Sequence, residues 1–341
     1  MASFEFHTVP RVICGPGEAL RMAQHCAGLG IRHLLLVTDP GLVSIGLIGP
    51  VQNALDEAGL GVTLYARVAE DPPESIVLAA TEAARNAGVD GVLAVGGGSS
   101  MDVAKVVAVL LGGDQDLPAL YGVNQVQGSR LPLILVPTTA GTGSEVTPVA
   151  VITTGETTKA GVSSPVLLPD IAVLDADLTL GLPPKITAMT GVDAMVHAIE
   201  AFTSRHKKNP VSDTLAHSAL ALLGRNIRTA VHDGRQRDAR GAMLLGAMQA
   251  GQAFANAPVA AVHALAYPLG GHFHIPHGLS NSLVLPSVLR FNLPAAAHLY
   301  AELAEHVTGH PLSGSDEARA DALLRGLETL IAELKLPTTL E

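Results

Sequence analysis

In the first half of the chain, short apolar runs alternate with stretches of helical periodicity. The apolar runs predict buried β-strands at His33–Thr38, Val62–Val68, Gly91–Val95, Leu131–Val136 and Ile171–Leu174. The stretches between them repeat apolar residues at helical spacing and predict helices at Val51–Ala58, Ser75–Ala87 and Met101–Leu111. Strands that alternate with helices in this way predict a parallel sheet with helices on both faces.

The pattern changes near residue 180. After the hairpin predicted from Val149–Thr154 and Lys159–Ser163, long Ala- and Leu-rich segments follow. They predict helices at Ile186–Thr203, Asp213–Val231, Asp238–Asn256 and Ala295–Val307. The sequence therefore predicts an α/β domain over residues 1–180 and an all-helical domain over residues 181–341.

Composition narrows the class of protein. Of the 341 residues, 48% are hydrophobic and 15% charged, and the formal net charge is −10. A chain of this kind can bury a large core, and it would on average be repelled by nucleic acid or an anionic membrane. The N-terminus lacks the pattern of a signal peptide, and no apolar stretch is long enough to span a bilayer. We therefore expect a cytoplasmic protein that binds neither nucleic acid nor membrane. Its two cysteines are too few for a disulfide framework.

A glycine-rich turn follows the predicted strand Gly91–Val95. Gly96, Gly97, Gly98 and Ser99 lie between this strand and the next helix, where backbone N–H groups and a helix N-terminus suit a phosphate. An ordinary tight turn is the alternative reading of three glycines. Asp102, in the first turns of the helix, suits the helix dipole with or without a ligand.

Polar residues also follow two other predicted strands. The segment Pro137–Glu145 offers hydroxyls to a ribose, phosphate or carboxamide from Thr138, Thr139, Thr142 and Ser144. Asp39 follows the strand His33–Thr38 and could accept hydrogen bonds from an adenosine ribose while repelling a 2′-phosphate. The alternative interpretation of Pro137–Glu145 is a polar loop with helix-capping hydroxyls, and that of Asp39 is a plain Asp-Pro-Gly turn.

Histidines and one aspartate form the sharpest pattern. Asp193 and His197 lie four residues apart on a predicted helix, so their side chains share a face. The segment from His263 to Gly278 then carries four of the chain's 14 histidines among Ala, Leu and Gly. The simpler interpretations are a solvated helix face for Asp193 and His197 and a core histidine for His263. However, uncompensated polar groups are costly in apolar surroundings, and imidazoles with a carboxylate are ligands for a divalent metal.

Taken together, these motifs resemble the iron-containing (group III) alcohol dehydrogenases. GGGSS with Asp102, PTTAGTGSE, GVDAMVHAIEAF followed by Asn209-Pro210, and HALAYPLGGHFHIPHG occur in this order. The resemblance extends from the N-terminus to beyond His277. It implies a dehydroquinate synthase-like architecture, in which a dinucleotide-binding domain precedes a helical domain and a metal lies in the cleft between them.

The resemblance also implies roles for individual residues. Asp193, His197, His263 and His277 match the metal ligands, and the metal is expected to be Fe²⁺, with Zn²⁺ as the alternative. Gly96, Gly97, Gly98 and Ser99 match the pyrophosphate loop, and Asp102 lies beside it. Asp39 matches the adenosine-ribose carboxylate, and NAD is the expected cofactor. Further cofactor contacts are expected from Thr138, Thr139, Thr142, Ser144 and Lys159.

Three positions depart from the family pattern. Tyr267 stands where several members carry a histidine thought to assist proton transfer, which leaves a proton-transfer role at this position open. Asp71 stands where an asparagine is common. The chain ends at Glu341, before the family's usual last helices, so either the C-terminus is shortened or that wall of the cleft is missing. Phe254 and Val151 are candidates for the substrate-facing wall, and core packing explains both equally well.

The function expected from these residues is NAD-dependent and metal-dependent alcohol oxidation or aldehyde reduction on a small substrate, in a homodimer. No catalytic residue beyond the metal ligands is assigned. A maleylacetate reductase, from a metal-free branch, and a glycerol dehydrogenase-like enzyme are the nearest alternatives. A metal-dependent hydrolase and a non-catalytic nucleotide-binding protein are alternatives from other classes.

Overall fold

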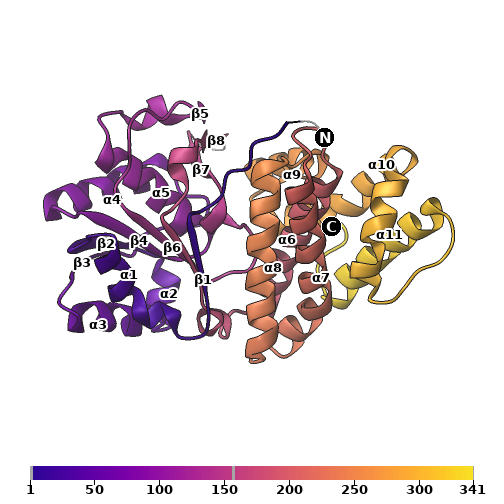
Figure 1. Ribbon diagram of the computed structural model, residues 1–341, viewed down its shortest axis with the longest axis horizontal. Coiled ribbons are helices and arrows are strands. Elements are labelled where there is room, and N and C mark those ends of the chain that lie inside the picture. Colours follow the sequence, from indigo (N-terminus) through magenta and orange to yellow (C-terminus); the bar gives the residue numbers. More distant parts are fainter. Residues whose placement is uncertain (1–2, 156–157, 341) are drawn as a thin grey trace. The chain divides into compact units, whose positions relative to one another are not determined.

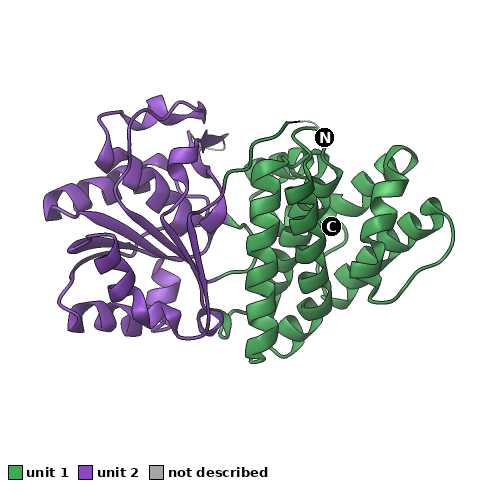
Figure 2. Cartoon of the chain, in the orientation of Figure 1, with its two compact units in different colours: residues 1–7, 139–143, 179–341 green, residues 8–138, 144–178 purple. Residues whose placement is uncertain are grey.

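The computed structural model describes residues 3–155 and 158–340. The chain divides into two compact units (Figure 2). One, the α/β unit, comprises residues 8–138 and 144–178. The other, the helical unit, comprises residues 1–7, 139–143 and 179–341. A short loop after one strand of the sheet thus belongs to the helical unit rather than to the sheet.

A parallel sheet forms the centre of the α/β unit. Its strands run in the order β1-β9-β6-β4-β2-β3, and each pairs in parallel with its neighbours. The strands are β1 (Arg11–Cys14), β2 (His33–Val37), β3 (Gly61–Tyr65), β4 (Gly91–Gly96), β6 (Leu133–Pro137) and β9 (Ile171–Leu174). Crossovers between parallel strands bring all their carboxyl ends to one edge, where ligands of such sheets bind.

Helices cover both faces of this sheet (Figure 1). Leu34 and Leu36 of β2 pack with α1 (Met22–Gly28) and α3 (Gly49–Glu57). Leu35 and Val37 pack on the opposite face with α4 (Glu74–Ala87) and α5 (Gly98–Gly112). The continuous apolar runs are therefore explained by burial on both faces, since alternate side chains of each strand enter different cores.

The predicted hairpin is present beside α5. Strands β7 (Val149–Thr154) and β8 (Thr158–Ser163) pair in antiparallel fashion, and β5 (Gly122–Val123) pairs with β8 in parallel. Ala150, Ile152 and Val162 of this small sheet join the core around α5. The remaining short elements of the unit are α2 (Pro40–Ser44) and the 3₁₀ turns at residues 18–21, 117–120, 144–146, 165–167 and 176–179.

The helical unit contains α6 (Pro184–Thr203), α7 (Pro210–His232), α8 (Arg237–Asn256), α9 (Ala261–Phe273), α10 (His277–Thr308) and α11 (Asp316–Glu333). Close approach of α7 and α10 explains one glycine, because a Cβ on Gly224 would lie 2.1 Å from the His306 carbonyl oxygen. None of the described helices is both long and apolar enough to cross a bilayer.

The structure extends or corrects several predicted elements. Strand β3 ends at Tyr65, three residues before the predicted end at Val68. The elements β1, α1, α9 and α11 were not predicted. The predicted helix Ala295–Val307 is the last part of the longer α10, which contains Pro286 and Pro294. Proline has a low propensity for helix interiors, so the sequence argued against a continuous helix here, but packing within the unit stabilises it.

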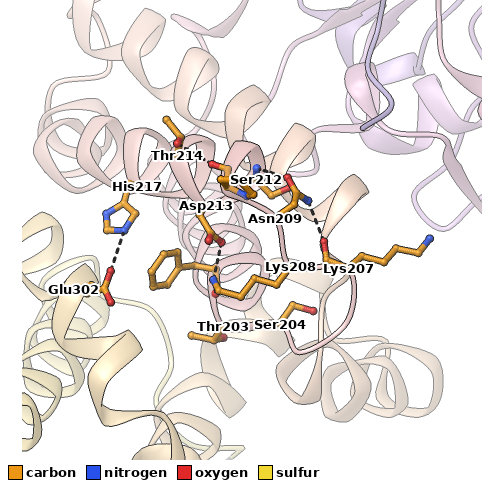
Figure 3. A network of polar contacts seen from close by, with 12 residues as sticks. Thr203, Ser204, Lys207, Lys208, Asn209, Ser212, Asp213, Thr214, His217 and Glu302 are labelled. Atoms are coloured by element: carbon orange, nitrogen blue, oxygen red, sulfur yellow. Dashed lines mark hydrogen bonds and ion pairs between the residues drawn. The ribbon is translucent and has the colours of Figure 1, made fainter. Parts of the chain in front are cut away.

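Polar contacts tie the ends of α6 and α7 together (Figure 3). Asn209 caps α7 by accepting a hydrogen bond from the Ser212 amide at 2.9 Å. Lys208 pairs with Asp213 at 2.6 Å, and its ammonium lies 4.0 Å from the centre of the Phe202 ring. The Asn209-Pro210 pair quoted above is therefore the beginning of a helix, with an N-cap followed by proline at the first position.

A second histidine pair connects α7 with α10. His217 Nδ1 and His306 Nε2 lie 3.0 Å apart. His217 Nε2 lies 4.0 Å from Glu302, as Figure 3 shows. Burial lowers the pKa of His306 below its usual value of 6.5, and His217 and Arg225 lower it further, while Glu305 opposes the shift. The folded protein thus favours a neutral His306.

This pair predicts a loss of stability in mild acid. Because the folded state depresses the His306 pKa, the unfolded state binds the proton more readily, so stability falls as the pH drops below about 6.5. His306→Gln removes this contribution. Urea unfolding at pH 7.5 and pH 5.5 is expected to show a smaller loss in His306→Gln than in the wild type. Equal losses in both proteins would contradict the assignment.

Candidate metal and cofactor sites

Helix α6 carries the first two predicted metal ligands. Asp193 and His197 are four residues apart and both are buried, with 2% and 4% of their surface exposed. Every residue from Gly191 to Phe202 is buried. Both side chains therefore point into the helical unit, so the solvated-face alternative for them is excluded.

Two later helices supply the other predicted ligands. His263 lies in the first turn of α9, and His277 is the first residue of α10. Between them, His274 adopts a left-handed backbone with φ of 55°, which ends α9 and turns the chain toward α10. One ligand atom from each of Asp193, His197, His263 and His277 lies within 4.8 Å of the other three.

The contacts among these four side chains are short. The Nε2 atoms of His197 and His263 are 2.9 Å apart, and Asp193 Oδ1 lies 3.6 Å from His277 Nε2. A divalent ion bound by nitrogen and oxygen at about 2 Å per ligand needs donors spaced on this scale. The structure thus brings together all four residues that the resemblance assigned to a metal.

Protonation of the histidines supports a cation at this position. His263 Nδ1 lies 2.6 Å from the Glu200 carboxylate, so this nitrogen carries the proton and Nε2 presents its lone pair. If His197 Nε2 donates to that lone pair, the buried His197 Nδ1, which has no hydrogen-bond partner, is left unprotonated and unsatisfied. If His197 Nδ1 holds the proton instead, two lone pairs face each other. An ion between the two Nε2 atoms removes the conflict.

The electrostatics favour deprotonated ligands. Burial alone would raise the pKa of Asp193, but His197, His277, His263 and Asn281 together hold it below the usual value. Burial lowers the pKa of His197 to about 4, so its ring is neutral at neutral pH. An ionised carboxylate with neutral imidazoles is the form that binds a divalent cation.

Two supporting residues were not assigned from the sequence. Glu200 accepts from His263 and, at 2.7 Å, from the Val262 amide, so it fixes both the ring and the start of α9. Asn281 donates to Asp193 at 2.6 Å and lies 3.3 Å from His277 Nε2. Helical spacing could have found both, since Glu200 lies three residues after His197 and Asn281 four after His277.

Aromatic rings flank the histidines. Phe254 of α8 stacks on His197, with ring centroids 4.3 Å apart, and Tyr267 of α9 stacks on His277 at 6.0 Å. Tyr267 is 45% exposed. Val151, the other candidate wall residue, lies in β7 of the α/β unit, where its amide donates to Asp102.

The predicted cofactor residues gather at one edge of the parallel sheet. Strands β2, β4 and β6 are neighbours, and Gly96 pairs in register with Pro137. Asp39 follows β2, Gly96 ends β4, and Thr138 follows β6, with the Thr138 amide donating to the Gly96 carbonyl at 3.0 Å. Three contacts assigned from separate motifs thus end adjacent strands on the ligand-binding side.

The glycine turn has the geometry of a phosphate cradle. Gly97 is the N-cap of α5, and Gly98 and Ser99 are its first residues. A Cβ on Gly96 would lie 2.6 Å from the Ser100 side chain, so only glycine fits there. The amides of this first turn are free of intrahelical partners by position, and they face the edge where a pyrophosphate would bind.

Other predicted cofactor residues make contacts within the protein. Asp39 caps α2 by accepting from the Leu42 amide at 3.0 Å. Ser144 donates to Asp102 at 2.6 Å. Lys159 pairs with Asp71 at 2.6 Å, and Asp71 adopts a left-handed backbone with φ of 49°. Thr139 and Thr142 are half-buried in the loop that belongs to the helical unit. Their roles toward a cofactor remain predictions.

Family comparisons cover almost the whole chain. Residues 10–176 match the family described as iron-containing alcohol dehydrogenase, and residues 187–341 match its C-terminal family. Long-chain-alcohol dehydrogenase 1 of Geobacillus thermodenitrificans is 42% identical over 329 residues, which are 96% of this chain and 83% of that protein.

Solved structures agree in fold as well as in sequence. A 1,3-propanediol oxidoreductase superposes with a TM-score of 0.95 at 35% identity, over 98% of this chain and 88% of that one. Sulfoacetaldehyde reductase from Bifidobacterium kashiwanohense, in complex with NAD⁺, superposes with a TM-score of 0.90 at 31% identity, over 100% and 88%. The chain is therefore an oxidoreductase that belongs to the iron-containing alcohol dehydrogenase family.

Proposed function

We propose that this protein transfers a hydride between a small alcohol and NAD, with Fe²⁺ held by Asp193, His197, His263 and His277. The single observation that carries the proposal is the convergence of these four donors, three of them buried and His277 partly exposed, within 4.8 Å in the helical unit. When bound, a divalent ion at such a site polarises an alcohol or carbonyl oxygen as a Lewis acid.

The chain's own residues prepare this site. Glu200 holds the proton on His263 Nδ1 and thereby keeps Nε2 available as a ligand. Asn281 donates to Asp193 and orients its carboxylate. Phe254 covers one face of the His197 ring and excludes water from it. Rigid placement of ligands on helices α6, α9 and α10 limits the reorganisation that binding requires.

The sheet edge is the proposed NAD site. Amides of Gly97, Gly98 and Ser99 bind the pyrophosphate, and Asp39 binds the adenosine ribose. Thr138, Thr139, Thr142, Ser144 and Lys159 complete the contacts to the cofactor, whose nicotinamide supplies or accepts the hydride. A bound dinucleotide at this edge uses the position that parallel sheets of this type offer.

The alternatives are less well supported. A maleylacetate reductase of the metal-free branch does not need four converging ligands, whereas this chain has them with a supporting carboxylate. A glycerol dehydrogenase-like enzyme fits the segment around His263 and His277 less well. A hydrolase needs no glycine turn at a sheet edge, and a binding protein needs no buried metal site.

Turnover with defined metals tests the proposal. Protein depleted of metal is assayed with short alcohols and NAD, and with aldehydes and NADH, after addition of Fe²⁺ or Zn²⁺ separately. We expect absorbance changes of the reduced nicotinamide only after metal addition. Full activity of a verified metal-free sample would exclude the metal-dependent reaction, and activity restored by Zn²⁺ alone would replace Fe²⁺ in the proposal.

Asp39 is expected to determine the preference for NAD. A carboxylate beside the adenosine ribose repels the 2′-phosphate of NADP, so Asp39→Ala should lower kcat/KM for NAD and raise it for NADP, changing the ratio about tenfold or more. Steady-state kinetics with both cofactors measure this ratio. Glu74→Ala serves as a control for an acidic residue of the same unit. An unchanged ratio in Asp39→Ala would contradict the assignment.

Substrate size, assembly and location complete the proposal. We infer a small alcohol or aldehyde as substrate, a homodimer as the assembly and the cytoplasm as the location, without nucleic acid or membrane as partners. Size-exclusion chromatography with light scattering measures the assembly. A series of alcohols of increasing chain length measures the substrate range.

A further inference from the structure

A fully buried lysine lies beneath the proposed NAD site. Lys105 is in α5, two turns after the glycine turn, and none of its surface is exposed. Nothing in the proposed reaction uses it. Burying an ammonium costs free energy unless its hydrogen bonds are made, so the contacts of Lys105 must offset the cost of its burial.

The ammonium of Lys105 uses all three of its hydrogens. It donates to Ser144 Oγ at 2.8 Å, to Thr147 Oγ1 at 3.3 Å and to the Val149 carbonyl at 2.7 Å. These acceptors lie in one segment, residues 144–149, which runs from the loop after β6 to the start of β7. Lys105 therefore binds this whole segment to α5.

Asp102 completes the same network from one turn earlier in α5. Its Oδ1 accepts from Ser144 Oγ at 2.6 Å, and its Oδ2 accepts from the Val151 amide at 2.9 Å. Asp102 Oδ1 also lies 3.8 Å from the Lys105 ammonium. Ser144 thus connects both charges, since its hydroxyl accepts from Lys105 and donates to Asp102.

The network joins two parts of the proposed cofactor site. Helix α5 begins with the glycine turn, and Ser144 is the first residue of the α/β unit after the loop of residues 139–143. The other end of that loop is held by the hydrogen bond from the Thr138 amide to Gly96. Without Lys105, the Ser144 end would lose its hydrogen bond to the ammonium and keep the one to Asp102.

From these contacts we propose that Lys105 is a positioning residue for NAD binding, which acts through Ser144 and holds residues 144–151 against the start of α5. It does not touch the cofactor, because it is buried. The charge balance fits this role. Burial lowers the pKa of Lys105 to about 8 while Asp102 and Glu145 oppose the shift, so the ammonium stays largely charged at neutral pH.

The proposal rests on the proposed NAD site, and two measurements separate the two. Lys105→Met keeps the length of the side chain and removes the charge and all three hydrogen bonds. Amide hydrogen exchange of residues 144–151 is expected to accelerate about tenfold or more in this variant, because local opening becomes easier. The dissociation constant for NAD, measured by calorimetry on the metal-loaded protein, is expected to rise about tenfold.

Arg130→Met is the matched control. Arg130 is a half-buried cation of the same unit, bound to Asp170 and to the Leu168 carbonyl, but it precedes β6 at the amino end of that strand. It is expected to lower thermal stability while leaving exchange of residues 144–151 unchanged. Its dissociation constant for NAD should stay within about twofold of the wild type, because the two sites are distant.

A double-mutant cycle tests whether Lys105 acts through Ser144. The variant carrying both Lys105→Met and Ser144→Ala should bind NAD within about twofold of the weaker single variant. The reason is that substitutions of residues that act together do not have additive effects on the binding free energy. If the increases in the NAD dissociation constant of the two single variants multiplied in the double variant, the proposal would be overturned. Unchanged amide hydrogen exchange of residues 144–151 in Lys105→Met would overturn it as well. If Lys105→Met fails to fold, Asp102→Ala and Ser144→Ala are compared in the same cycle. A wild type that binds no NAD would refute the proposed function and the NAD-binding role of Lys105, while hydrogen exchange would still decide whether Lys105 holds residues 144–151.

Discussion

Asp193→Ala is expected to lower kcat about a thousandfold or more while the protein stays folded, because Lewis-acid polarisation contributes several kcal/mol to such reactions. The side chain is 2% exposed and supplies the single carboxylate of the ligand set. Its removal leaves three imidazoles and no carboxylate among the four proposed ligands. The metal should then bind weakly, and added Fe²⁺ should not restore turnover.

Two readouts separate this loss from unfolding. Far-UV circular dichroism and the melting temperature of Asp193→Ala should remain close to those of the metal-free wild type, because the substitution removes the cost of burying a carboxylate together with its hydrogen bond from Asn281. Asp213→Ala is the control, since Asp213 lies on α7 of the same unit and pairs with Lys208. It should retain the wild-type kcat. Substantial turnover in Asp193→Ala would reject the ligand assignment.

Glu200→Gln is expected to weaken metal binding about 10- to 100-fold, the range typical of a lost carboxylate behind a histidine ligand. The amide keeps the size of the side chain and can still accept from the Val262 amide. However, it does not reinforce the proton on His263 Nδ1 as a carboxylate does. His263 is then a poorer ligand, although all four ligands are still present.

Competition with a chromophoric chelator measures this affinity directly. Saturating Fe²⁺ should restore most of the activity of Glu200→Gln, whereas it should not restore Asp193→Ala. This contrast separates a residue that supports a ligand from a ligand itself. Glu302→Gln, on an exposed part of α10, is the matched control and should bind metal as the wild type does. Wild-type affinity in Glu200→Gln would contradict the role of Glu200.

Much of the α/β unit could be predicted from the sequence because its signals are local. Apolar runs such as Leu34–Val37 are buried on both faces of a parallel sheet, and this burial leaves a continuous pattern. The order of the strands is not local information. That β2, β4 and β6 are neighbours, and that Asp39, Gly96 and Thr138 therefore line one edge, depends on pairing between distant segments.

The helical unit was harder to predict at its ends. Pro268 lies inside α9, and Pro286 and Pro294 lie inside α10, so propensity argued against helices that tertiary packing stabilises. Asp193 and His197 could be paired from spacing alone, since both lie on α6. His263 and His277 could be assigned only by resemblance, because they lie on different helices.

Taken alone, the sequence determined the alternation of strands and helices, the glycine turn and the i,i+4 pair on α6, because each arises from backbone periodicity within a few residues. Only the tertiary structure decided which side chains from distant parts of the chain form hydrogen bonds with one another. It showed that Glu200 orients His263, that Asn281 orients Asp193, and that Lys105 and Asp102 share Ser144. These partners are 39 or more residues apart on separate elements, and their meeting depends on how those elements pack rather than on any local pattern.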